Sequence, residues 1–251
     1  MSDRIRRLVF LLSGALFFVL YCYAAASLPP WGHYRGPYGN VIARVAVIER
    51  HATDVVNAIN YDYRGFDTLG EEFILFTAVL GVMLLLRREE GPPGPRGGGG
   101  KIPDAKVLST TIQIFTLPAA FLTTLFGFYI GLHGQLSPGG GFQAGVILST
   151  AVLLVYIAQN TEAFQRITSH TVVEVLEAAG AGGYAIVGLL ALAGGLPFLT
   201  NFLPLGPTGN VFSAGTIALI SAIVGVEVTA AFLLVTYTYL QEIMRGSIPN
   251  G

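Results

Sequence analysis

Six long apolar runs constrain this chain more than any other feature of its sequence. They cover approximately residues 8–26, 69–86, 107–132, 142–159, 172–194 and 214–240. Each run has about 18 residues or more, the length that a helix needs to cross the hydrocarbon core of a bilayer. Inside lipid the backbone must satisfy its own hydrogen bonds, so only helices and closed barrels can span. The sequence therefore predicts an all-α integral membrane protein with about six transmembrane helices.

The composition supports a lipid environment and excludes several other classes of protein. Charged residues make up 12% of the chain, about half of the roughly 25% typical of soluble domains. The formal net charge of −1 argues against a nucleic-acid partner, which requires a basic surface. Cys22 is the only cysteine, and the four histidines stand in no metal-binding spacing. We expect no metal and no cofactor in this chain, and no catalysis by the chain alone.

The positions of Lys and Arg predict the orientation in the membrane. With the N-terminus in the cytoplasm, ten basic residues fall in inside segments and four in outside segments. Because short cytoplasmic segments are enriched in Lys and Arg, we expect both termini in the cytoplasm of a prokaryotic cell with the chain in its plasma membrane. The first run is longer than a signal-peptide core of about 7–15 residues, so we expect it to remain as a helix.

A Gly- and Pro-rich stretch divides the chain. Residues 89–101 read EEGPPGPRGGGGK, a composition unsuited to a helix or strand. The sequence predicts a two-helix unit over residues 1–88, a cytoplasmic linker over 89–106 and a four-helix unit over 107–251. The pattern suggests a fusion of two ancestral proteins, with one long surface loop as the alternative.

An amphipathic segment lies between the first two apolar runs. Residues 41–59, VIARVAVIERHATDVVNAI, place apolar side chains at near-helical spacing with charged residues between them. This pattern predicts a helix on the outer membrane interface, in contact with lipid. A helix that docks on a neighbouring protein would have the same pattern.

Four carboxylates precede or open the second run: Asp62, Asp67, Glu71 and Glu72. One interpretation is structural, with Thr68 capping the second helix and Glu71 as its capping-box partner. The other is functional, with the carboxylates gathering cations or protons at the outer mouth of a pathway.

A glycine-rich turn leads into the fourth run and is formed by Pro138, Gly139, Gly140, Gly141 and Phe142. Gly141 and Gly145 are four residues apart, which favours close helix packing. A backbone site for an ion or a lipid head group at this helix start is the alternative. The nearby His133 is either a proton relay or a hydrogen-bonded surface histidine.

Glu227 lies at the midpoint of the sixth run. A charge at the centre of a bilayer costs at least about 2.5–3.5 kcal/mol, so this carboxyl group must be protonated, paired or in contact with water. It is either a pathway residue or a protonated side chain bonded to a neighbouring helix. The polar neighbours expected at its depth are Thr123, Thr124, Ser149 and Thr150. Glu177, near the inner end of the fifth run, is a weaker pathway candidate.

Two motifs, in this order, resemble components of Mrp-type multisubunit Na+/H+ antiporters. Residues 55–88 resemble the C-terminal piece of the large MnhA-like component, and also a small component of energy-converting hydrogenases. The shared residues are Asn57, Asp62, Arg64, Gly65, Phe66, Asp67, Thr68, Leu69, Gly70 and Glu71. Residues 107–240 resemble the MnhB component, whose mark is the P-G-G-G-F turn at residues 138–142.

The resemblance implies a membrane subunit that contributes to Na+ or H+ translocation beside other Mrp-like subunits. It makes Asp67 and Glu71 pathway candidates, whereas Glu227 lies on no motif of the family. The doubled Glu71 and Glu72, the linker and the fusion depart from the antiporter pattern. A membrane-arm subunit of a redox-driven, complex I-like or hydrogenase-like assembly is therefore one alternative, and a purely structural scaffold is another.

Overall fold

The computed structural model describes residues 3–28, 32, 36–86, 110–159, 164 and 167–245, so the predicted linker at 89–106 lies outside the described residues. Residues 1–41 and residues 42–251 form two compact units. Within the described residues, six helices are long and apolar enough to cross a membrane. The predicted all-α membrane fold is confirmed.

The first unit is dominated by helix α1 (Asp3–Ala26). Its candidate span, Arg7–Ala26, has a mean hydropathy of 2.2. Large apolar side chains such as Phe10, Phe17 and Tyr23 are exposed along the helix. A helix that is apolar all round and uncovered by its own chain suits a lipid environment.

Three short helices replace the single amphipathic helix expected over residues 41–59: α2 (Pro37–Arg50), α3 (Val55–Ala58) and the π-helix η1 (Ile59–Tyr63). His51 has a φ of +52°, a left-handed conformation that ends a right-handed helix. Asp54 then caps α3 by accepting a hydrogen bond from the Val56 amide at 2.9 Å. The prediction of one continuous helix is wrong because the backbone reverses at His51.

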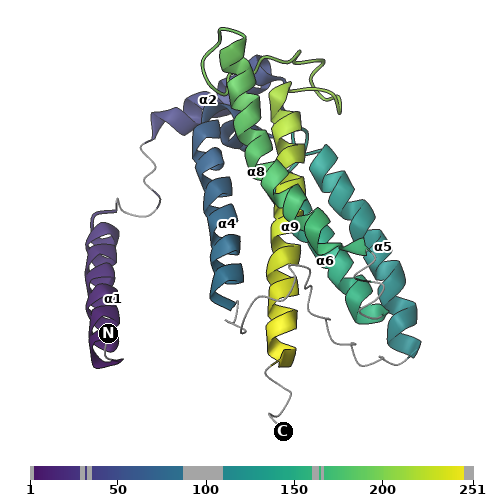
Figure 1. The fold of residues 1–251 in the computed structure, drawn as a ribbon. Helices are drawn as coiled ribbons and strands as arrows, with labels where there is room; N and C mark the ends of the chain where they lie inside the picture. The colour runs from purple at the N-terminus through teal and green to yellow at the C-terminus, as the bar shows by residue number, and fades with distance from the viewer. Residues whose placement is uncertain are drawn as a thin grey trace. The chain divides into compact units, whose positions relative to one another are not determined.

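Five membrane helices form the second unit (Figure 1): α4 (Gly65–Leu86), α5 (Thr110–Leu132), α6 (Gly141–Ala158), α8 (His170–Ala193) and α9 (Thr216–Arg245). Helix α9 packs against α4, α6 and α8, and α5 packs mainly against α6. The span of α9 is 61% buried and that of α5 only 11%. Helix α9 is therefore the centre of the bundle.

The two ends of the bundle are distinguished by the connections that they carry. We call the end that carries η1 and residues 194–215 the loop end. Helices α4 and α9 begin at the loop end, and α8 begins at the opposite end and runs toward it (Figure 1). A residue one or two turns into α4 and a residue one or two turns into α8 therefore lie near opposite ends.

Helix α4 begins earlier than the apolar run suggests. It starts at Gly65, so Thr68 lies inside the first turns, buried, and its hydroxyl donates to the Asn60 carbonyl at 2.7 Å. The interpretation of Thr68 as a cap is wrong, because η1 extends the helical path through Tyr63 and moves the helix start upstream. Asp67 occupies the first turn instead, where a carboxylate suits the helix dipole.

Glycines on α6 set its distance from α9. A Cβ added to Gly145 would lie 2.6 Å from Cβ of Val228, and one added to Gly141 would lie 2.8 Å from Cβ of Val224. No side chain fits at such distances, so the two backbones approach closely along this face.

Candidate functional site

Glu227 is fully buried at the centre of α9, with an exposed fraction of 0%. Neither of its carboxyl oxygens has a hydrogen-bond partner among the described residues. Buried polar groups in proteins are nearly always bonded, and an exception calls for an explanation. A carboxyl group that is both buried and unpartnered inside a membrane bundle points to a functional role.

Two further buried carboxyl groups accompany Glu227. Glu72 on α4 and Glu177 on α8 are each 3% exposed. Each has one oxygen, Oε2 of Glu72 and Oε1 of Glu177, without a hydrogen-bond partner in the described chain. Both interact electrostatically with Glu227. We call Glu72, Glu177 and Glu227 the carboxylate row.

The row exists because three helices converge. Helices α4, α8 and α9 pack pairwise against one another. A Cβ added to Gly180 on α8 would lie 2.8 Å from Cα of Glu227 and 3.1 Å from its backbone nitrogen. The absence of a side chain at Gly180 lets α8 approach α9 at the level of Glu227, one turn beyond Glu177.

The expected polar neighbours of Glu227 use their hydroxyl groups elsewhere. Thr124 donates to the Ala120 carbonyl at 2.8 Å, and Ser149 and Thr150 each donate to the Val146 carbonyl at 2.8 Å. These bonds stay within α5 and α6. The electrostatic partners of Glu227 are carboxyl groups instead, which sequence reasoning missed because the register between helices leaves no local signal.

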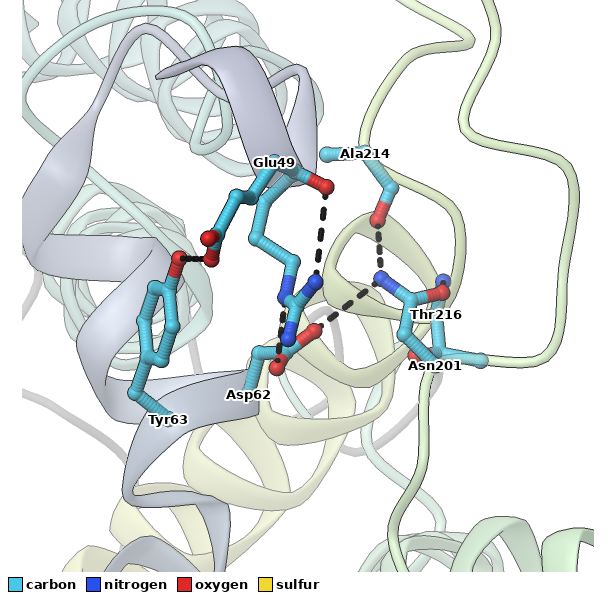
Figure 2. Close-up of polar contacts among 7 residues, drawn as sticks. Glu49, Asp62, Tyr63, Asn201, Ala214 and Thr216 are labelled. Carbon is cyan, nitrogen blue, oxygen red and sulfur yellow. Dashed lines mark hydrogen bonds and ion pairs between the residues drawn. The ribbon is translucent and has the colours of Figure 1, made fainter. Parts of the chain in front are cut away.

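A polar network covers the loop end of the bundle (Figure 2). Arg50 Nε forms an ion pair with Asp62 at 2.8 Å, and its guanidinium lies 5.0 Å from the centre of the Tyr63 ring. Asn201 Nδ2 donates to Asp62 at 3.2 Å. Tyr63 donates to Glu49 at 2.7 Å. Asp62 is thus held from two sides, by a residue of α2 and by a residue of the 194–215 segment.

Asn201 also closes the segment that leads into α9. Its Nδ2 donates to the Ala214 carbonyl at 2.9 Å, and its Oδ1 accepts from the Thr216 amide at 2.8 Å (Figure 2). Asn201 therefore caps α9 from a distant position. Nothing in the local sequence identified Asn201 as functional or structural.

A polar pocket of about 640 Å³ opens within this network. It is lined by Arg50, residues 62–67 and residues 198–201. Asp67 lies at this pocket, where its carboxylate accepts from Arg64 Nε at 2.6 Å, and it is exposed. Glu71 is also exposed, on the turn that carries the buried Glu72. The structure thus separates the four predicted carboxylates: Asp62 and Asp67 line the pocket, whereas Glu72 is inside the bundle.

Tyr61 lies between the pocket and the carboxylate row. It precedes Asp62 on η1, is 4% exposed, and interacts electrostatically with Glu72. Burial raises the pKa of the Tyr61 phenol above its usual value, and the nearby Glu72 raises it further. The phenol therefore keeps its proton at physiological pH. A π-helix is rare and is frequent at functional sites, and here it directs Tyr61 inward.

The glycine-rich turn is held by residues 53–57. Asn57 Nδ2 donates to Asp54 at 3.0 Å, to the Gly139 carbonyl at 3.2 Å and to the Gly134 carbonyl. Asn57 Oδ1 occupies the space that a side chain at Gly140, with a φ of +129°, would need. The turn therefore binds a neighbouring segment of its own chain.

His133 lies apart from these groups, at the end of α5. Its ring stacks on Tyr129 with centroids 4.4 Å apart, and Nδ1 lies 3.2 Å from the Tyr129 carbonyl oxygen. Both contacts are with its own helix.

Two family models match separate parts of the chain. A domain related to the MnhB subunit of the Na+/H+ antiporter matches residues 111–234, and the MbhE family of MBH matches residues 35–94. These matches fall on either side of the glycine-rich stretch.

Several proteins are similar in sequence. The MnhB-type Na+/H+ antiporter protein of Bacillus subtilis is 33% identical over 100 residues, which cover 39% of this chain and 68% of that protein. A probable K+/H+ antiporter protein of Rhizobium meliloti, in which the first two components are combined, is 32% identical over 129 residues, 45% of this chain but only 13% of that protein. An uncharacterised protein of Methanocaldococcus jannaschii is 29% identical over 206 residues, 71% of this chain and 76% of its own length.

Two solved structures share the fold. One is a chain of the membrane-bound sulfane sulfur reductase, an archaeal respiratory membrane complex, with 29% identity and a TM-score of 0.68; the match covers 94% of this chain and 98% of that one. The other is a chain of the Mrp complex from Dietzia sp., with 23% identity and a TM-score of 0.69, covering 99% of this chain and 27% of that one.

Proposed function

The chain belongs to the MnhB family of Na+/H+ antiporter subunits, joined to a segment that matches the MbhE family, and from this premise we propose that it provides part of a route for protons or Na+ through an Mrp-type membrane module. The carboxylate row is the observation that supports this proposal. The chain acts beside other Mrp-like subunits, with both termini in the cytoplasm of a prokaryotic cell and the loop end outside.

The depths of the three carboxyl groups suit a stepwise route. Counted at about 1.5 Å per residue, Glu72 lies about 10 Å from the loop end of α4, and Glu227 about 16 Å from the loop end of α9. Glu177 lies about 10 Å from the opposite end of α8. In a hydrocarbon core about 30 Å thick, the three groups are therefore staggered through its middle third.

The chemistry of the row suits proton or cation transfer. A carboxyl group can hold a proton or neutralise a cation, and its neighbours in the row can take over the charge in turn. Three adjacent buried carboxyl groups cannot all be ionised without strong repulsion, so they share their charge. The pocket at the loop end, with Asp62 and Asp67, supplies an acidic mouth that concentrates cations.

A scaffold function makes the opposite prediction, and the variant Glu227→Gln distinguishes the two. The amide keeps the shape of the side chain but can neither release a proton nor carry charge. We expect the variant to assemble with its partners while transport in vesicles falls by about tenfold or more.

The matched control for Glu227→Gln is Glu49→Gln, because Glu49 is an exposed glutamate outside the row and a glutamine can still accept from Tyr63. Glu49→Gln should leave transport unchanged. Normal transport by an assembled Glu227→Gln complex would establish the scaffold instead.

A redox-driven complex is the second candidate for the parent assembly. The MnhB-type protein of Bacillus subtilis matches only 39% of this chain, whereas the sulfane sulfur reductase chain matches 94% of it and is itself matched over 98% of its length. The whole two-part architecture therefore occurs in a respiratory complex.

Purification of the tagged chain in mild detergent, followed by mass spectrometry of the proteins that accompany it, decides between the two parents. Proteins with iron–sulfur or nickel motifs would identify a redox pump. Antiporter proteins alone would identify an antiporter.

A further inference from the structure

We propose that His170 and Glu174 form the proton exchange pair at the end of the carboxylate row where α8 begins, passing protons between Glu177 and the surface. This inference rests on the proposed route and specifies the proton as its cargo at this end. The sequence alone favours His170 as an ordinary surface residue.

The three residues lie on one face of α8. Their spacing, i, i+4 and i+7, places His170, Glu174 and Glu177 above one another along the helix. The His170 and Glu174 side chains are 33% and 45% exposed, and Glu177 is 3% exposed. Within two turns the helix face passes from the surface to the buried row.

Contacts join each residue to the next. His170 Nδ1 lies 3.3 Å from Glu174 Oε2, and Glu174 interacts electrostatically with Glu177. Glu177 in turn interacts with Glu227. A continuous series of ionisable groups therefore connects the surface at the α8 start with the centre of the bundle.

The His170 ring is positioned by α9. It packs edge-on against Tyr237, with ring centroids 5.0 Å apart, and Tyr237 is 7% exposed. Tyr237 also stacks on Phe164 at 6.4 Å. The imidazole is thus fixed beside the row by α9, the helix that carries Glu227.

The chemistry of the pair favours exchange over a structural role. Histidine is the side chain that gains and loses protons near neutral pH, and it serves as a proton shuttle. Partly exposed ion pairs add little to stability. A protonated histidine at the first position of a helix also opposes the helix dipole, so stability does not explain His170 there.

The test uses the assembled complex in vesicles, with proton flux as the readout. We expect His170→Ala and Glu174→Gln each to lower the flux severalfold without loss of assembly. Added imidazole, a soluble proton carrier, should restore most of the flux in His170→Ala and none in Glu227→Gln.

The outcomes separate this inference from the proposed route. Unchanged flux in His170→Ala and Glu174→Gln, together with lost flux in Glu227→Gln, would overturn the exchange pair alone. A loss in His170→Ala that imidazole does not restore would make His170 a structural residue and also overturn it. Normal flux in Glu227→Gln would overturn the route and the pair together.

Discussion

Glu72 of α4 and Glu227 of α9 interact inside the bundle as two buried carboxyl groups, although they lie on opposite sides of the glycine-rich stretch. The two parts that the family models match separately therefore share one site. A carboxyl pair of this kind depends on the packing of the helices that carry it, and that packing can be tested.

Gly180→Ala tests the approach of α8 to α9. The added methyl group would meet the Cβ and backbone of Glu227, and overpacking of this kind typically destabilises by about 1–3 kcal/mol. We expect a lower midpoint of thermal unfolding in detergent. Gly182→Ala, on the same helix and with nothing within 4 Å of the added Cβ, is the control, and equal effects of the two changes would contradict the contact.

Asn57→Ala tests the attachment of residues 53–57 to the glycine-rich turn. The change removes the donor to Asp54 and to the carbonyls of Gly134 and Gly139. Leaving buried acceptors unsatisfied costs about 1–3 kcal/mol, so thermal stability in detergent should fall. Asn60→Ala, at an exposed neighbouring position, should have little effect; a stable Asn57→Ala protein would show that the attachment contributes nothing.

Asn201→Ala tests the closure of the loop end. It removes the remote cap of α9 and one of the two partners of Asp62. Loss of a cap typically costs about 1 kcal/mol, and we expect faster amide hydrogen exchange at the start of α9. In Asn210→Ala only a local bond to the Phe212 amide is lost, and this control should leave α9 unchanged. Exchange in Asn201→Ala as slow as in the unaltered chain would exclude the cap.

Much of the fold could be predicted because hydropathy alone locates membrane spans. The structural spans begin and end within a few residues of the apolar runs, except that α4 starts at Gly65. The polar segment before α4 could not be read in this way. A positive φ at His51 and a π-helix at Ile59–Tyr63 depend on tertiary contacts, including the contact between His51 and the Gly206 carbonyl.

The site was predictable residue by residue but not as an arrangement. The depth of Glu227 marked it as unusual, and Glu72 and Glu177 stood out as carboxylates in apolar runs. Their meeting depends on the rotation and register of three helices, for which a single sequence carries no local signal. Gly180 is the one residue whose small size reports that meeting, yet it is one of 32 glycines in the chain.

Ion flux through the assembled complex in vesicles, measured for Glu72→Gln, Glu227→Gln and the double variant, tests the carboxylate row most directly. Groups that act in series fail together, so their effects should not add. The account predicts that each single variant loses most of the flux and that the double variant loses no more than the worse single one. Normal flux in either single variant, or two partial losses that multiply in the double variant, would contradict it.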